Sequence, residues 1–276
     1  FEPDCGITDY EYFVPRVCRR LQLPCLSLDH QHIVTCPVPR IPISQWPGYV
    51  GLYLSVTRLF SAASEFLVVS FFMNGIEKNG GAFRVLPPIL RKPLLQIQPE
   101  DQGHVVAYQS TSTFKRYLTL LQAIGRPVMV YGHTSTGREG NLHFKPPSEK
   151  GFLEDLARCS YVICGGSHTL MSEALHLGKP VFAFPIANLF EQYLNVHHLQ
   201  KLRYGRFSTD FTIGSEVLLG FEKHLDQYRE NIEKASFCGN EQVFTLLDRY
   251  LSQGTIRQRS EAPGNIAHGS ARPPVC

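Results

Sequence analysis

Short apolar segments alternate with helix-like segments over most of the chain, and this alternation is the feature that most constrains the fold. The segments HVVAY, PVMVY, YVIC and PVFAF are typical of buried strands. The stretches between them have the length and the apolar spacing of helices. Strands that alternate with helices predict a parallel sheet with helices on both faces. We therefore predict an α/β fold with a Rossmann-like parallel sheet.

The composition excludes several classes of protein. Of the 276 residues, 43% are hydrophobic and 18% are charged, which is typical of a globular chain with an ample core. The net charge of +3, without a dense cluster of Lys and Arg, gives no indication of a nucleic-acid partner. The eight cysteines include no Cys-x-x-Cys pair, so we expect no zinc site. Cys25, Cys159 and Cys164 lie in or beside apolar runs, as expected of buried free thiols in a cytoplasmic protein.

Changes in composition divide the chain into four parts. The segment NGIEKNGG is rich in glycine and asparagine and is the best linker in the sequence. The last residues lack hydrophobic periodicity, which predicts a disordered tail. The chain opens abruptly with FEPDC, so we expect its first part to be the end of a truncated domain. The predicted parts are the remnant of an N-terminal domain at 1–73, a linker at 74–83, a C-terminal domain at 84–253 and a tail at 254–276.

The most apolar stretch, 49–72, is not predicted to span a membrane. Arg58 and Glu65 interrupt it, and its period changes from helical to strand-like. Its first half can present an apolar face, either to a sheet that it covers or to a membrane surface as a peripheral contact. This face would consist of Val50, Leu52, Tyr53, Leu54, Leu59 and Phe60.

A Gly-Gly-Ser turn, Gly165 to Ser167, separates the strand segment YVIC from a helix-like segment. In open α/β sheets, ligands bind beyond the carboxyl ends of the strands. Glycines let the backbone approach a ligand closely, and the free N–H groups of a helix start suit a diphosphate. Ser167 and Thr169 can cap the helix or donate to phosphate oxygens, and His168 can contact phosphate as well. The alternative is an N-capped turn without a ligand.

Polar side chains farther along predict sugar contacts. Glu173 lies about one turn into the helix and is well placed to accept two ribose hydroxyls, although it can equally be a solvated helix charge. Glu191, Gln192 and Asn195 start the next helical segment, after the strand segment PVFAF. Side-chain amides there suit sugar hydroxyls, and the alternative is that they are ordinary polar residues of a helix N-terminus.

The segment CGGSHTLMSEALHLGKPVFAFPIANLFEQYLNVHHLQKLRYG closely resembles the donor-binding half of glycosyltransferases of the family 28 type, such as lipid II N-acetylglucosaminyltransferases and galactolipid synthases. The shared pattern is a glycine-rich turn, Ser-Glu, Gly-Lys-Pro, a strand that ends in Pro, and then Glu-Gln and Asn. The resemblance is most specific over 159–205 and moderate over 84–158, and it covers residues 1 to about 250, weakly at both ends. It implies a GT-B fold, in which two Rossmann-like halves face each other across the active site. Residues 84–253 would then bind a nucleotide sugar, and 1–73 would belong to a truncated acceptor domain.

The resemblance also assigns site residues. The turn and helix start would hold the donor diphosphate, Glu173 the ribose, and Glu191 and Gln192 the transferred sugar. The sequence QSTST stands where relatives have glycines, so hydroxyl groups would replace backbone contacts there. The donor-binding residues implied are Gln109, Ser110, Thr111, Phe144, Lys145, Gly165, Gly166, Ser167, His168, Thr169, Glu173, Glu191, Gln192 and Asn195, with Phe144 and Lys145 against the uracil ring.

The activity implied is transfer of a hexose or an N-acetylhexosamine from a nucleotide sugar, with UDP as the expected nucleotide, to an acceptor hydroxyl. We find no Asp-x-Asp motif, so we expect neither a metal nor a cofactor. The segment LDHQHIV offers the general base: His30 or His32, oriented by Asp29. The alternative is that these histidines line the cleft without transferring protons.

The sequence is also compatible with two other functions. A sugar-nucleotide 2-epimerase shares the two-domain architecture, and a non-catalytic donor-binding subunit would need a partner chain. A lipid or polyprenyl-linked acceptor is consistent with the family. A dinucleotide dehydrogenase is disfavoured because no Gly-x-Gly-x-x-Gly follows a strand. Because the acceptor domain is expected to be truncated, we also expect this chain to bind the donor weakly or to have little catalytic activity.

Overall fold

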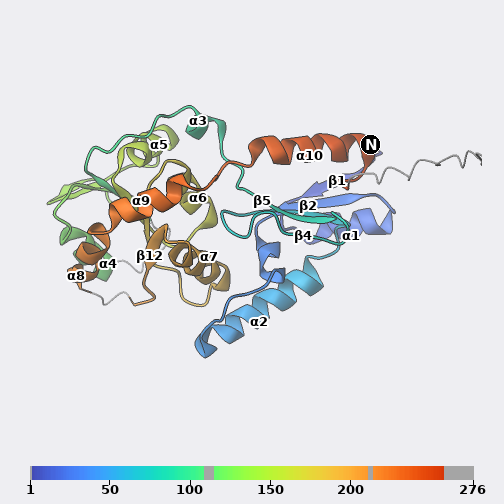
Figure 1. Ribbon diagram of the computed structural model, residues 1–276, viewed down its shortest axis with the longest axis horizontal. Helices are drawn as coiled ribbons and strands as arrows, with labels where there is room; N and C mark the ends of the chain where they lie inside the picture. The colour runs from blue at the N-terminus through green and yellow to red at the C-terminus, as the bar shows by residue number, and fades with distance from the viewer. Residues whose placement is uncertain (1, 109–114, 211–213, 258–276) are drawn as a thin grey trace, which may run out of the picture.

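The computed structural model describes residues 2–108, 115–210 and 214–257, which form two lobes with one β-sheet each (Figure 1). The N-terminal lobe has a five-stranded sheet in the order β1-β2-β3-β5-β4. All neighbouring strands are parallel except β4, which runs antiparallel to β5. The strands are β1 (Gly6–Thr8), β2 (Cys25–Asp29), β3 (Glu65–Val69), β4 (Glu77–Lys78) and β5 (Phe83–Leu86).

Both ends of the described chain contribute to the N-terminal lobe. Helix α10 returns from the C-terminal lobe and lies along the first sheet (Figure 1). Its Val243, Leu246 and Tyr250 form one buried cluster with Leu26 and Leu67 of the sheet. The helices of this lobe are α1 (Phe13–Arg20), α2 (Trp46–Leu54) and α10 (Asn240–Gln253), with 3-10 turns at Gln31–Thr35 and Ile43–Gln45 and a π-helical turn at Ser55–Leu59 after α2.

The C-terminal lobe has a seven-stranded sheet in the order β12-β11-β10-β6-β7-β9-β8. It is parallel except for β8, which is antiparallel to β9. The strands are β6 (Val105–Tyr108), β7 (Val128–Tyr131), β8 (Gly137–Glu139), β9 (Leu142–Phe144), β10 (Tyr161–Cys164), β11 (Val181–Ala183) and β12 (Gly205–Phe207). The helices are α3 (Lys92–Leu95), α4 (Lys115–Gln122), α5 (Glu149–Arg158), α6 (His168–His176), α7 (Phe190–Lys201), α8 (Ser215–Glu222) and α9 (Leu225–Glu233).

The predicted α/β fold with Rossmann-like parallel sheets is confirmed. Every residue of β10 is buried, as expected of a strand covered by helices on both faces. A hydrophobic core also joins the two lobes. It brings Val68 and Phe72 of the N-terminal lobe into one cluster with Met171 and Phe190 of the C-terminal lobe. Helices α6 and α7 therefore lie directly against the N-terminal lobe.

The predicted part boundaries differ from the structure at several places. The predicted C-terminal domain, 84–253, includes most of β5 and all of α10, which belong to the N-terminal lobe. The segment 74–83 is not a linker, because β4 pairs with β5 inside the first sheet. The chain crosses between the lobes after Leu86 instead. The start of the predicted tail is docked: Ile256 is fully buried, and its N–H donates to Glu65 Oε2 at 2.7 Å. Most of the predicted tail, 258–276, lies outside the described residues.

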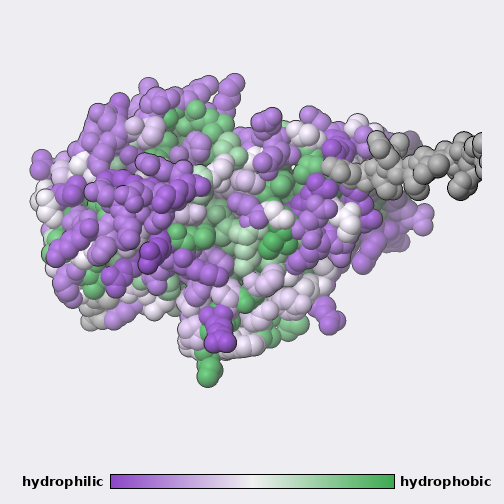
Figure 2. Space-filling model, viewed as in Figure 1, coloured by the Kyte–Doolittle hydropathy of each residue, from purple (hydrophilic) through white to green (hydrophobic). Residues whose placement is uncertain are grey.

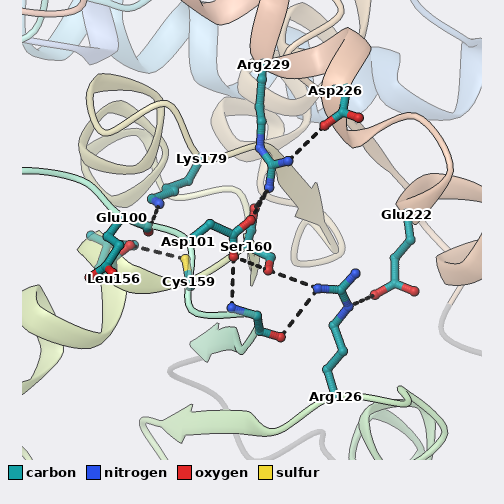
Figure 3. A network of polar contacts seen from close by, with 11 residues as sticks. Glu100, Asp101, Arg126, Leu156, Cys159, Ser160, Lys179, Glu222, Asp226 and Arg229 are labelled. Atoms are coloured by element: carbon teal, nitrogen blue, oxygen red, sulfur yellow. Dashed lines mark hydrogen bonds and ion pairs between the residues drawn. The ribbon is translucent and has the colours of Figure 1, made fainter.

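A polar network lies at the amino ends of the C-terminal strands, opposite the Gly-Gly-Ser turn (Figure 3). Asp101 accepts hydrogen bonds from Ser160 Oγ at 2.6 Å and from Arg229 at 2.7 Å. Lys179, from the Gly-Lys-Pro segment, is buried and donates to the Glu100 carbonyl at 2.6 Å. These contacts tie α9 and the start of β11 to the sheet, so this part of the shared motif has a structural role here.

Two further expectations can be compared with the structure. Cys25, Cys159 and Cys164 are buried free thiols, as predicted. In the described ranges, no helix combines the length and the hydrophobicity needed to cross a bilayer.

Candidate active-site cleft

The Gly-Gly-Ser turn joins the carboxyl end of β10 to the start of α6, as predicted. Gly166 has φ +90°, a conformation that favours glycine, and a Cβ atom there would lie 3.0 Å from Val196 Cγ1. Ser167 is the N-cap of α6, and it makes no side-chain capping bond to any described residue. The first N–H groups of a helix have no intrahelical partner. The turn therefore presents backbone and hydroxyl donors at the edge of the sheet.

Two cavities meet at this helix start, between the lobes. The first, called the α2-side cavity, has a volume of about 580 Å³, and the second, the β1-side cavity, about 490 Å³. Thr169, His168, His30 and Gln31 line both. The α2-side cavity is also lined by Gly48, Gly51, Leu52, Ser167, Glu191 and Gln192, and the β1-side cavity by Ile7, Thr8, Asp9, Asp29, Val69 and Ile89.

His30 joins the two lobes and is not a free base. Its Nδ1 lies 2.8 Å from the Val69 carbonyl oxygen and its Nε2 lies 2.8 Å from Asn195 Oδ1. The Asn195 Nδ2 donates in turn to the Gly166 carbonyl at 3.2 Å. Since both nitrogens are engaged, His30 does not offer the unoccupied nitrogen that the predicted base requires.

His168 lines both cavities, and its ring also takes part in the packing between the lobes. Its ring stacks on His30, with centroids 3.7 Å apart, and on Phe71, with centroids 5.6 Å apart. Burial and, to a lesser extent, the charge of His30 lower the pKa of the His168 ring well below its ordinary value. The ring is therefore neutral near pH 7 and adds no positive charge to the predicted phosphate contact, which stays a prediction.

Asp29 forms a pair with His32, and of the two only Asp29 lines a cavity. Burial would raise the pKa of Asp29, yet hydrogen bonds from His32 and Ser27 and the charge of His32 together lower it. His32 Nδ1 lies 2.8 Å from Asp29 Oδ2. Its Nε2 is buried and has no hydrogen-bond partner among the described residues. His32 lines neither of the two cavities, so this geometry does not support it as the base.

The three polar residues predicted on α7 have different surroundings. Glu191 and Gln192 line the α2-side cavity, as a sugar contact requires. Gln192 Oε1 accepts from the Ile186 N–H at 2.9 Å, which fixes its amide. Asn195 is fully buried, and its side-chain amide contacts His30 and donates to the Gly166 carbonyl. Its amide is therefore held by contacts within the protein, and Asn195 lines neither cavity.

Glu173 is not placed as a free ribose ligand. It is buried, and its two carboxylate oxygens accept from Arg91 Nε at 2.6 Å and from Arg91 NH2 at 2.7 Å. Arg91 also pairs with Glu149 at 3.0 Å. Glu173 lines neither cavity of the cleft. The position of Glu173 on the helix follows from the local sequence, but its arginine partner, 82 residues away, does not.

Two of the remaining predicted donor residues, Phe144 and Lys145, lie at the carboxyl end of β9. Phe144 ends β9 and is buried. The Lys145 N–H donates to the Val130 carbonyl at 2.9 Å, and its ammonium pairs with Asp155 at 3.1 Å. The predicted first phosphate loop, Gln109, Ser110 and Thr111, lies outside the described residues.

The cleft includes polar residues that the sequence did not reveal. Thr8, Asp9 and Gln31 line the β1-side cavity. Thr8 and Asp9 belong to β1 and the residue after it, a strand that the sequence analysis did not identify. A strand end is the signal that would have found them, because polar residues there face the ligand edge of the sheet.

A pH-dependent stability follows from His198, which lies on α7 and stacks on Phe72 with centroids 4.2 Å apart. Burial, and then the charges of His197 and Lys201, lower the pKa of His198 to about 4. Below about pH 6.5, His198 binds a proton in the unfolded chain but not in the folded chain. The free energy of unfolding therefore decreases by about 1.4 kcal/mol for each pH unit below this value. A His198→Phe variant is expected to lose less stability than the wild type between pH 7 and pH 5.

Urea unfolding at the two pH values measures this difference. His224→Phe is the matched control, because His224 is exposed. An equal loss of stability in the wild type and in His198→Phe contradicts the prediction.

The two lobes, with one Rossmann-like sheet each, and the cavities between them define the class of fold, which is GT-B. Among solved structures, the chain is similar to UGT2 of Phytolacca americana, complexed with UDP-2-fluoro-glucose and pterostilbene. The TM-score is 0.64 at 13% identity, with 91% of this chain and 77% of that chain covered. It is also similar to the calicheamicin glycosyltransferase CalG4, with a TM-score of 0.62 at 12% identity over 91% of this chain and 76% of that chain.

The sequence profile described as Glycosyl transferase family 1 matches residues 1–225. The chain belongs to this family and is a glycosyltransferase. No match was found among the curated proteins. The family comparison does not confirm the narrower family 28 type. The sequence resemblance and the comparisons agree on the GT-B fold.

Proposed function

We propose that the protein transfers a hexosyl or N-acetylhexosaminyl group from a UDP sugar to an acceptor hydroxyl. The observation that carries this proposal is the pair of cavities on either side of the α6 N-terminus. One cavity can hold the donor and the other the acceptor, and Thr169 and Gln31 lie where the two meet. A transfer reaction needs such an arrangement, because the acceptor oxygen must reach the anomeric carbon.

The donor diphosphate is assigned to the start of α6. The free N–H groups there, with the hydroxyls of Ser167 and Thr169, can neutralise the departing diphosphate without a metal ion. A helix dipole contributes about 0.3–2 kcal/mol to an anion at its N-terminus, and preorganised donors add to this in a site that excludes water. Glu191 and Gln192 would contact the transferred sugar. The contact of Phe144 and Lys145 with the uracil ring belongs to the same proposal.

The acceptor is proposed to carry a lipid or polyprenyl tail. A hydrophobic side chain protrudes at the lower tip of the molecule, near α2, among pale and hydrophilic residues (Figure 2). Exposed residues of this segment include Ile43, Trp46, Val50 and Leu54. Such a face suits a peripheral contact with a membrane that contains the tail. Co-sedimentation with lipid vesicles tests the contact, and protein that stays in the supernatant at all lipid concentrations speaks against it.

A donor screen tests the proposed function. The purified chain is incubated with UDP-glucose, UDP-galactose, UDP-N-acetylglucosamine and the corresponding GDP and dTDP sugars, and release of free nucleotide is measured. We expect release from a UDP sugar, and calorimetry is expected to show binding of the same donor. A change of configuration at C2 of the sugar without nucleotide release would indicate an epimerase. Binding without release until another chain is added would indicate a subunit that needs a partner.

A further inference from the structure

The strongest unassigned group in the cleft is Asp9, which follows β1 and lines the β1-side cavity. Asp9 is exposed, and its side chain is not buried in the core. Partial burial and, to a lesser extent, the nearby charge of Asp29 raise the pKa of Asp9 above its ordinary value. A carboxylate in this setting can accept a proton from a bound hydroxyl group.

The other carboxylate and the histidines that line the β1-side cavity are already held by contacts within the protein. Asp29 accepts hydrogen bonds from His32 and Ser27. His30 bridges Val69 and Asn195, and the ring of His168 is stacked between two other rings. Asp9 is therefore the lining residue that combines a proton-accepting group with access to the cavity.

The walls of the β1-side cavity indicate what it binds. Thr8 Oγ1 and Gln31 Oε1 are buried and have no hydrogen-bond partner in the part of the chain that the structure describes. Buried polar atoms are normally paired, so a bound group with several hydroxyls can supply these partners after a small side-chain rotation. Ile7, Val69 and Ile89 provide an apolar wall beside them. An apolar wall with scattered polar groups suits the face and the hydroxyls of a sugar ring.

We propose that the β1-side cavity is the acceptor site, that it takes a sugar ring, and that Asp9 is the general base of the transfer. This inference rests on the proposed function. The acceptor hydroxyl gives its proton to the Asp9 carboxylate, and its oxygen forms a bond to the anomeric carbon of the donor. The bond between that carbon and the diphosphate oxygen breaks, and the diphosphate leaves with the electron pair. Asp9 then releases the proton to solvent.

The test compares Asp9→Asn with Asp4→Asn, the same substitution at an exposed position before β1 that does not line the cavity. The donor is the UDP sugar that the screen selects. The acceptors are methyl glucoside, methyl galactoside and methyl N-acetylglucosaminide, with 4-nitrophenol as a non-sugar hydroxyl. We expect transfer to a methyl glycoside that falls by about 100-fold or more in Asp9→Asn. Donor affinity by calorimetry should be unchanged in both variants, and Asp4→Asn should keep full activity.

The pH profile separates a base from a merely structural residue. The other titratable groups that line this cavity are Asp29, His30 and His168. The wild-type rate should fall at acidic pH as Asp9 takes up a proton, and this decrease should be missing from the residual activity of Asp9→Asn. Normal transfer by Asp9→Asn with bound donor overturns the assignment of the base, and transfer to 4-nitrophenol but to no glycoside overturns the acceptor class. If no nucleotide sugar binds the wild type, the proposed function itself fails.

Discussion

A Gly239→Ala variant is expected to lose about 3 kcal/mol or more of the free energy of unfolding. Gly239 lies where the two connections between the lobes run side by side. Its N–H donates to the Pro88 carbonyl at 2.7 Å, and a Cβ atom would lie 2.2 Å from the Pro87 carbonyl oxygen. The clash is with backbone, so one connection has to move away from the other. Overpacking of this kind commonly costs about 1–3 kcal/mol, and more where the backbone cannot yield.

The contact between the connections is reinforced next to this glycine. Asn240 Oδ1 accepts from the Leu90 N–H at 2.8 Å, and Asn240 Nδ2 donates to the Leu90 carbonyl at 2.7 Å. Gly220→Ala in α8 is the matched control, since the described residues leave free space around its added methyl group. Gly220→Ala should be neutral or stabilising by up to about 1 kcal/mol. Equal midpoints of urea unfolding for the two variants would contradict this account of the crossing.

An Asn195→Leu variant is expected to lose about 2–5 kcal/mol of stability together with most of the transfer activity. The side chain is fully buried, and its amide joins His30 of the N-terminal lobe to Gly166 of the C-terminal lobe. Leucine has nearly the same size but leaves the His30 nitrogen and the Gly166 carbonyl without partners. Each such buried group costs about 1–3 kcal/mol. The turn that is proposed to hold the diphosphate would also lose its support.

Asn141→Leu is the control for this experiment. Asn141 Nδ2 donates to the carbonyls of Leu121, Ile124 and Arg126, all within the C-terminal lobe. The Asn141→Leu substitution should therefore reduce the free energy of unfolding without changing the cleft. Nucleotide release, measured at a temperature at which both variants are folded, should fall in Asn195→Leu alone. A similar activity of the two variants would show that the bridge from Asn195 does not position the site.

The sequence predicted the regular parts of this fold well, for physical reasons that are local. The buried strand YVIC, the glycine turn and the apolar face of α6 each follow from the spacing of residues within about 20 positions. The short strands β1, β4, β8 and β12 were not predicted, because each has at most one large apolar residue, whereas the equally short β11 lies in the apolar segment PVFAF. The return of α10 to the first sheet was missed because helix α10 alone does not reveal which lobe it covers.

The site was predicted less completely than the fold. The position of the α6 N-terminus and of Glu191 and Gln192 follows from the order of strands and helices. The surroundings of Glu173 and Asn195 do not, since their partners Arg91 and His30 are far away in the sequence. Long-range pairing decides whether a polar side chain faces a ligand or holds the protein together.

The central claim is that the start of α6 binds the diphosphate of a nucleotide sugar, and Thr169 allows a direct test. Thr169 is exposed at the second position of the helix and lines both cavities. Glutamate at this position is favourable for the helix dipole, so Thr169→Glu should be at least as stable as the wild type. Its carboxylate would occupy the place proposed for the diphosphate and repel it. Thr169→Gln has nearly the same shape without the charge.

The deciding measurement is the affinity of the two variants for UDP, determined by calorimetry at low ionic strength. We predict that Thr169→Glu binds UDP at least about tenfold more weakly than Thr169→Gln, because two like charges would share one small site. If UDP binds both variants with equal affinity, the diphosphate does not lie at the start of α6, and the account of the cleft given above is wrong.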